Sequence, residues 1–204
     1  GSNASKKQKK PSGMVEQTLP FIEPQVRLAK QIIAQLGDFT VLTPNDDILN
    51  NIRQLAQIFV DVGELNVYPD EISDIFIKCM SALPVQSTIV SSLLGLIFRR
   101  EDAFAVLVVR KLGDAFINAL KQNDVNVAKI CLRSMAALTC SGCLTTDGDG
   151  SLLKILETLI HRIELSGKAG VQNLTIEGKV ALYLLASTIP WLGDTMKYWS
   201  NLYD

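Results

Sequence analysis

The residues best suited to catalysis are few and isolated in this sequence. The single histidine, His161, lies late in a predicted helix beside Arg162, and no Ser or Cys nucleophile occurs at helical spacing from it. Acid–base and nucleophilic catalysis both require an oriented network of partner groups. We therefore expect a surface histidine with no catalytic role. Because the sequence also lacks a nucleotide-binding loop and an evident pair of site carboxylates, it argues against an enzyme.

Three short motifs resemble ligand-binding loops without completing them. Cys140 and Cys143 have the CxxC spacing, but a zinc site needs four ligands and the redox motif needs a strand-to-helix turn. The stretch 147–150 lacks the glycine and the glutamate that a calcium loop requires further along. Gly167 and Lys168 lack the preceding glycine and the following hydroxyl of a phosphate loop. We expect a turn and a helix cap at 147–150, and neither a metal nor a cofactor at any of the three motifs.

Basic residues provide the remaining candidates for binding. We expect one group to gather where two helices meet and to offer a surface to an acidic partner, although a solvated rim is the more common role of such side chains. This group consists of Arg99, Arg100, Arg110 and Lys111. A second group is a short stretch of the kind that nuclear import receptors read, and it consists of Lys6, Lys7, Lys9 and Lys10.

Charge is unevenly distributed along the chain. Its 204 residues carry a formal net charge of -1, but the first ten residues contain four lysines and no acid, which leaves the remainder mildly acidic. Nucleic-acid binding draws most of its affinity from Lys and Arg side chains that neutralise phosphates. The acidic body is therefore a poor candidate for holding RNA or DNA alone, and we expect any link to nucleic acid to run through a partner protein.

Cysteine usage and hydropathy bear on the compartment. The four cysteines have neither the density nor the spacing of a secreted disulfide framework, which favours a reducing compartment. The longest apolar stretches, such as 103–109 and 180–186, fall short of the ~18 residues that a membrane span requires. No secretory signal is visible. We expect a soluble chain with no contact to a membrane.

Periodic apolar residues predict helices through most of the chain. With 48% hydrophobic, 20% charged and only 6% aromatic residues, the core must be built mainly from aliphatic side chains, as in packed helices. No strand pattern of period two stands out. The predicted helical runs are about 26–36, 48–62, 69–83, 87–99, 101–121, 127–138, 151–163, 175–189 and 191–202. The run 101–121 is apolar around most of its circumference and is predicted to be the central helix.

The helices are predicted to form consecutive pairs. The pairs start near Pro24, Asp70, Glu101 and Asp149, and the starts recur every ~30 to 50 residues, close to the ~40 to 47 of HEAT-type repeats. The predicted fold is therefore all-α, a HEAT-like α-α superhelix of stacked antiparallel helix pairs. Such stacks bury one face of each pair and offer the other for binding.

Two domain boundaries are predicted from composition. The opening Gly-Ser-Asn-Ala-Ser resembles a remnant of an expression vector, and residues 1–18 as a whole are predicted to form a flexible basic tail. Residues 19–204 are predicted to be a single helical-repeat domain that is truncated at its C-terminal end. We therefore expect the chain to be a fragment of a longer protein.

Three stretches carry a resemblance to a known family. They are 88–97, 112–138 and 184–193, and the last, Leu-Leu-Ala-Ser-Thr-Ile-Pro-Trp-Leu-Gly, is the most specific. Here the chain resembles the large subunit of the nuclear cap-binding complex, in its first helical domain, whose fold is that of the middle domain of eukaryotic initiation factor 4G. In this motif Pro190 is expected to stop a helix, and Trp191 to pack across the junction. The stretch 165–175 departs from the family pattern.

The resemblance implies a nuclear scaffold that shuttles to the cytoplasm. It implies a small partner subunit with an RNA-recognition domain, which holds the 7-methylguanosine cap and is contacted mainly by regions outside this chain. The large subunit would recruit mRNA processing, export and decay factors, including those of nonsense-mediated decay, and would contact capped RNA only indirectly. Two alternatives remain open: a scaffold of the same fold in translation initiation or RNA decay that binds a helicase, and a HEAT-type transport receptor.

Overall fold

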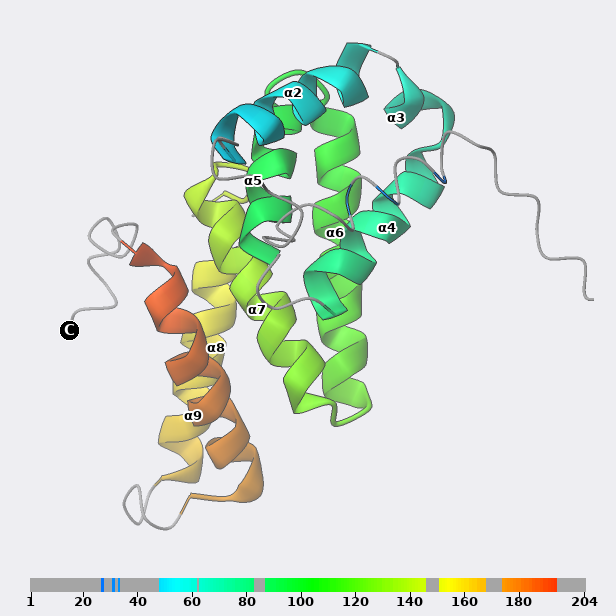
Figure 1. Ribbon diagram of the computed structural model, residues 1–204. Coiled ribbons are helices and arrows are strands. Elements are labelled where there is room, and N and C mark those ends of the chain that lie inside the picture. Colours follow the sequence, from blue (N-terminus) through cyan, green and yellow to red (C-terminus); the bar gives the residue numbers. More distant parts are fainter. Residues whose placement is uncertain are drawn as a thin grey trace, which may run out of the picture.

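Every described element of the protein is helical (Figure 1). The computed structural model describes residues 48–61, 63–82, 87–145, 151–167 and 174–193, together with Arg27, Gln31 and Ile33. These residues form eight α-helices and one 3-10 helix, η2, with no strand among them. The elements are α2 Ile48–Asp61, α3 Glu64–Val67, α4 Pro69–Ala82, α5 Ser87–Phe98, α6 Asp102–Lys121, α7 Val125–Cys140, α8 Leu152–Ser166, α9 Ile176–Thr188 and η2 Ile189–Trp191.

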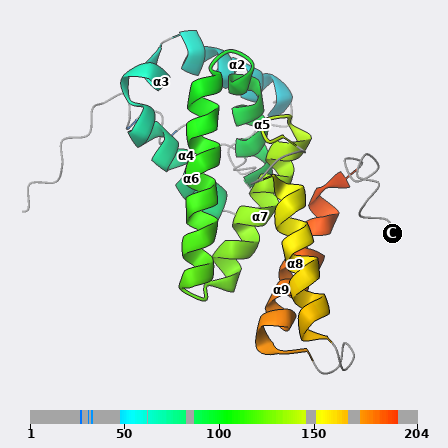
Figure 2. The same cartoon turned by 180° about the vertical axis from the view of Figure 1, so that it is seen from behind.

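The helices stack in the manner predicted for an all-α superhelix. One row runs through α2, α5, α7 and α9, each packing against the next, while α4 and α6 form a second row against α5 and α7. In Figure 1 and Figure 2, α6 and α7 are antiparallel and are joined by a tight turn, and α8 lies beside α9 at the end of the array. No described helix combines the length and the apolar character needed to cross a bilayer.

Side-chain caps explain where several helices begin. Asp124 Oδ1 accepts a hydrogen bond from the backbone N–H of Val127 at 3.0 Å, so the predicted turn after α6 also starts α7. Ser151 and Thr175 cap α8 and α9 in the same way, through bonds of 3.3 and 3.2 Å. At the end of α2, Gly63 adopts a φ of 69°, which only glycine adopts without strain. Each of these helix boundaries is therefore determined by residues close to it in the sequence.

The core is aliphatic with one short aromatic chain. Phe76 of α4 lies between Phe59 of α2 and Phe104 of α6, with edge-on ring contacts whose centroids are 6.3 and 5.7 Å apart. All three are buried, as their helical spacing predicts. Ile33 lies in helical backbone and is fully buried. Of the residues expected to face inward on α8, Leu152, Leu156 and Leu159 are buried and Ile163 is half-buried. The predicted helices 26–36 and 191–202 lie outside the described residues, except for Arg27, Gln31, Ile33 and residues 191–193.

The central helix is α7 rather than the predicted α6. Helix α7 packs against α4, α5, α6, α8 and α9, and small buried residues such as Ala128, Ser134 and Ala136 let these neighbours approach. On α6, by contrast, Val106 is 59% exposed and Ile117 is 49% exposed. An apolar circumference was therefore a poorer guide to the centre than the distribution of small residues.

Two short elements also differ from expectation. The four-residue helix α3 was not predicted, because a single turn is too short to show apolar periodicity. At the other end, α9 ends at Thr188, before Pro190, and residues 189–191 then form a 3-10 turn that was not predicted. Proline is tolerated there because the first residues of a helix need no N–H donor.

Candidate partner-binding surface

The four basic residues predicted to gather at one surface are divided by the structure. Arg99 and Arg100 lie together and exposed in the turn between α5 and α6. Arg110 and Lys111 lie farther along α6, about 15 Å from that turn by the rise of a helix. Arg110 is exposed, whereas Lys111 is turned toward α4. Only the two arginines in the turn therefore share a surface.

Lys111 is held by two carboxylates of α4. Its Nζ lies 2.7 Å from Asp74 Oδ1 and 3.0 Å from Asp70 Oδ1, and it also donates to the carbonyl oxygen of Asp70. Burial lowers the pKa of this ammonium, but the hydrogen bonds from it to Asp74 and Asp70 outweigh that effect and raise the pKa above its usual value. Lys111 thus joins α4 to α6 and is not free to receive a partner.

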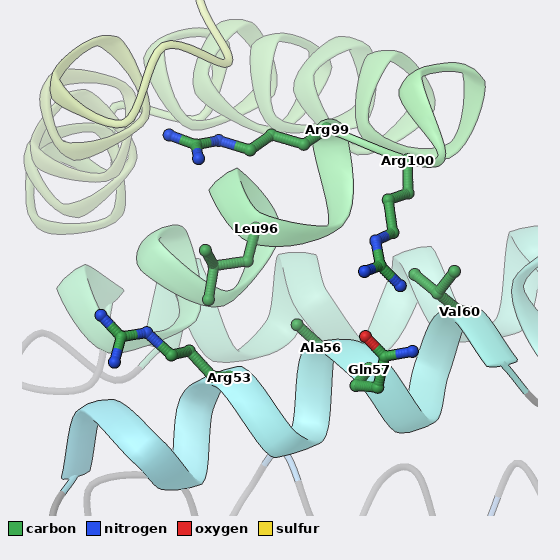
Figure 3. Close-up of a pocket in the computed structure, with 7 residues that line it drawn as sticks. All are labelled: Arg53, Ala56, Gln57, Val60, Leu96, Arg99 and Arg100. Atoms are coloured by element: carbon green, nitrogen blue, oxygen red, sulfur yellow. The ribbon is translucent and has the colours of Figure 1, made fainter.

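A pocket of about 230 Å³ lies between α2 and the turn that carries Arg99 and Arg100. It is lined by Arg53, Ala56, Gln57, Val60, Leu96, Arg99 and Arg100. Figure 3 shows Arg53 and Arg99 extending toward the same end, with Leu96 between them, whereas Arg100 turns toward Gln57. Three guanidinium groups from two separate elements therefore border one apolar floor.

One acidic residue beside this pocket, Asp61, is already engaged. Gln57 Nε2 donates to both carboxylate oxygens of Asp61, one turn further along α2, at 2.6 Å. Arg100 Nη1 lies 4.0 Å from Asp61 Oδ1, and both side chains are more than half exposed. An exposed ion pair of this length contributes little. Arg100 is therefore only weakly neutralised by Asp61.

Arg53 was missed by the sequence analysis. It lies 46 positions before Arg99, in a helix whose other residues gave no reason to single it out. The one available signal was its place on α2, one turn before Gln57 and three residues before the buried Ala56. That spacing puts Arg53 at the edge of the packed face, but only the contact between α2 and α5 brings it to Arg99.

A second hollow has a different chemistry. It is an apolar groove of about 520 Å³ between the C-terminal end of α6 and the pair α8 and α9. Its apolar lining includes Phe116 and Leu120 of α6, Leu159 of α8 and Val180 of α9. Ile176, at the start of α9, borders the groove and is 81% exposed. Three charged residues also line this groove, but unlike those of the arginine pocket they include both signs: Lys121, Arg162 and Glu177.

The residues considered for catalysis or ligation have ordinary surroundings. His161 is exposed on α8, with Nδ1 3.7 Å from Glu164 Oε2 one turn away. Cys140 and Cys143 are not joined in a disulfide: Cys140 Sγ donates to the carbonyl oxygen of Leu192 at 3.4 Å, and Cys143 receives a contact from Ser141. No group of three or more His, Cys, Asp or Glu side chains in the described part is placed to hold a metal ion.

Other predicted motifs have partial outcomes. Gly167 caps the end of α8, with its N–H bonded to the carbonyl oxygen of Ile163 at 2.9 Å. The stretch 147–150 and Lys168 lie outside the described residues. The basic group Lys6, Lys7, Lys9 and Lys10 also lies outside them, as does the whole predicted tail 1–18.

The Ser-Thr-Ile-Pro-Trp segment forms the junction between α9 and α7. Thr188 is buried and donates to the carbonyl oxygen of Leu184 at 2.7 Å, while Leu192 is fully buried. Trp191 is half-buried beneath Arg133 of α7, whose guanidinium carbon lies 5.3 Å from the ring centroid. The indole therefore packs across the junction, as its place after the proline predicts.

This segment was the most specific part of the family resemblance, and a direct comparison supports it. The chain is 24% identical over 129 residues to nuclear cap-binding protein subunit 1 of Arabidopsis thaliana. The aligned part is 62% of this chain and 15% of that protein, so the chain spans a small share of its length. None of the protein-family models matches the chain.

The helical fold is compatible with this distant similarity. The chain has stacked helices and a packed Pro190–Trp191 junction, and its sequence is similar at low identity to a nuclear cap-binding subunit. The name of that relative describes a nuclear, cap-binding assembly with more than one subunit.

Proposed function

We propose that this chain is a helical segment of the large subunit of a nuclear mRNA cap-binding complex. It acts as a non-catalytic scaffold, supporting a small RNA-recognition subunit that binds the 7-methylguanosine cap. Other surfaces recruit mRNA processing, export and decay factors. The observation that carries the proposal is the similarity to nuclear cap-binding protein subunit 1 over 62% of the chain, in a molecule built of stacked helices.

The chemistry of the described surface supports a role in binding. A stack of helix pairs offers long surfaces for partners. The arginine pocket, with Arg99 and Arg100 at its rim, is one such surface. The acidic body agrees with indirect contact to capped RNA, because phosphate recognition would favour a strongly basic surface. The small subunit is expected to contact mainly regions beyond this chain.

Retention on a cap resin tests the proposal. The full-length parent protein is applied to immobilised 7-methylguanosine, with and without a co-expressed small RNA-recognition subunit from the same organism. We expect retention only in the presence of the small subunit, and release by free 7-methylguanosine but not by guanosine. If the parent protein forms no complex and is not retained, the alternative scaffolds in translation initiation, RNA decay or nuclear transport take precedence.

Nuclear entry is a separate part of the proposal. We propose that Lys6, Lys7, Lys9 and Lys10 serve as the import signal, because short lysine clusters are read by import receptors. A fluorescent fusion of the chain should accumulate in nuclei, and replacement of these four lysines by glutamine should abolish the accumulation. A matched replacement of exposed lysines on the folded body, Lys154 and Lys179, should leave it intact. Equal nuclear accumulation of both variants would show that these four lysines are not the import signal.

A further inference from the structure

We infer that the pocket between α2 and the α5–α6 turn binds an acidic or phosphorylated peptide through Arg53, Arg99 and Arg100. The recognised chemistry is an oxyanion, either a phosphate monoester or a carboxylate, beside an apolar side chain. This inference deepens the proposed scaffold function, on which it rests for the presence of protein partners. A partner protein of the scaffold must then carry an oxyanion beside an apolar side chain.

The guanidinium groups of the pocket are largely open to a ligand. Within the residues that the structure describes, the side chains of Arg53 and Arg99 form no ion pair or hydrogen bond, and both residues are exposed. Arg100 has only the 4.0 Å approach to Asp61, whose oxygens are bound by Gln57. A guanidinium offers five N–H donors in a planar fork that matches carboxylate and phosphate oxygens. Peptide binding therefore requires no strong ion pair to break.

The arrangement of the three side chains defines two ends of a short site. Arg53 and Arg99 lie at one end, and Arg100 lies at the other (Figure 3). The apolar floor consists of Ala56 and Leu96, between the two ends, and of Val60 beside Arg100 (Figure 3). An extended peptide can place an apolar side chain on this floor and an oxyanion at the end with two arginines. The site therefore fits an apolar side chain next to an oxyanion rather than a single charge.

Size and composition favour a peptide over other ligands. A volume of about 230 Å³ is below the roughly 300–1,000 Å³ typical of small-molecule pockets, which suits one or two side chains. The pocket has no aromatic residue in its lining, whereas binding of single-stranded RNA commonly uses base stacking on aromatic rings.

Binding to defined probes tests the inference. Fluorescence anisotropy of the 204-residue chain is measured with labelled peptides that contain phosphoSer-Leu-phosphoSer, Glu-Leu-Glu or Ser-Leu-Ser between Gly-Ser flanks, and with single-stranded oligouridine. We expect the phosphorylated peptide to bind at least about tenfold more tightly than the Ser peptide, because each phosphate carries about two charges and three acceptor oxygens. Comparison with the Glu peptide distinguishes phosphate from carboxylate as the source of the oxyanion.

Matched variants assign the binding to the pocket. Arg53→Gln and Arg99→Gln should each weaken binding of the phosphorylated peptide about tenfold, and Arg100→Gln should weaken it less because of Asp61. Arg53→Lys should recover only part of the affinity, because an ammonium lacks the guanidinium fork. Arg110→Gln is the control, since Arg110 is exposed and equally charged but lies on α6. Unchanged thermal melting of each variant confirms that the fold is retained.

Three results would overturn the inference. They are the absence of binding to both anionic peptides, an equal loss in Arg110→Gln, and tighter Arg53-dependent binding of oligouridine than of either peptide. Each leaves the cap-resin result of the parent protein untouched. Conversely, failure of cap-dependent retention would remove the proposed complex while peptide binding by the pocket still stood, so the two failures are distinguishable.

Discussion

Arg133 of α7 holds Trp191 by stacking and holds the end of α9 by a hydrogen bond. Its guanidinium carbon lies 5.3 Å from the indole centroid, and its Nε donates to the carbonyl oxygen of Ser187 at 3.1 Å. The carbonyls of the last turn of a helix have no donor within the helix. Arg133 therefore caps α9 and fixes the chain that follows it.

Replacing Arg133 with Met should lower the free energy of unfolding by about 1–2 kcal/mol, because a charged hydrogen bond and a cation–π contact are lost. Urea denaturation measures the change, and a double-mutant cycle with Trp191→Leu should give a coupling of about 0.5–1 kcal/mol. Lys129→Met is the matched control. Lys129 also contacts an aromatic residue of α9, Tyr183, but at an exposed position, so its loss should cost less. Equal effects at both positions would contradict the junction role.

Two helix glycines should respond in opposite directions to alanine. A Cβ added at Gly95 would lie 2.7 Å from Ser141 Cβ and 3.1 Å from Ser141 Oγ, so Gly95→Ala should cost about 1–3 kcal/mol. A Cβ at Gly113 meets nothing within 4 Å, so Gly113→Ala should stabilise the protein by about 0.5–1 kcal/mol through helix propensity. Chemical denaturation of both variants measures the difference, and a loss at Gly113 would show that α6 is not open there.

The sequence was informative where structure depends on neighbouring residues. The starts of α7, α8 and α9 lie within two residues of the starts of the predicted runs, because Asp124, Ser151 and Thr175 cap backbone N–H groups three residues away. Core positions such as Phe76 and Phe104 were predicted because helical periodicity places them on one face. These signals are local and do not require knowledge of which helix packs on which.

The candidate site depended on contacts that local signals do not contain. Arg99 and Arg100 were identified as a charged group, but their meeting with Arg53 arises from the packing of α2 on α5. Lys111 was grouped with them because of its charge, whereas its position relative to Asp70 and Asp74 follows from the packing of α4 on α6. Charge alone could not separate a side chain that joins two helices from one that is open to a partner.

A buried serine should prove more important than an exposed one with a similar bond. Ser134 is fully buried in α7, and its Oγ donates to the carbonyl oxygen of Met80, in the last turn of α4, at 2.9 Å. Ser92 is exposed and donates to Thr88 within its own helix at the same distance. Ser134→Ala should cost about 1–3 kcal/mol, because the Met80 carbonyl loses its partner in the core.

Ser92→Ala should be neutral or slightly stabilising, because alanine has the higher helix propensity and the lost bond is replaced by water. Thermal unfolding of both variants gives the comparison. A Ser134→Ala variant as stable as the parent chain would mean that water or another donor reaches the Met80 carbonyl, and that α4 and α7 are not joined by this bond.

Alkaline pH should weaken the protein through Cys131. Burial, assisted by the negative charge of Asp124, raises the pKa of this thiol from 9.0 to about 11. Between these values the thiol ionises in the unfolded chain but stays protonated in the folded one, so the folded state binds more protons and stability falls as pH rises. The slope from this one group is at most about 1.4 kcal/mol per pH unit.

Denaturation of the parent chain and of Cys131→Ala across pH 8 to 11 isolates this contribution, because the other titrating groups are common to both. The variant should be less stable at neutral pH, since a buried side chain is shortened, but its stability should decline less steeply above pH 9. Cys140→Ala serves as the control, because it removes a thiol that is exposed rather than buried. Parallel curves for the parent chain and Cys131→Ala would mean that the folded thiol ionises as readily as the unfolded one, which its complete burial beside Asp124 argues against.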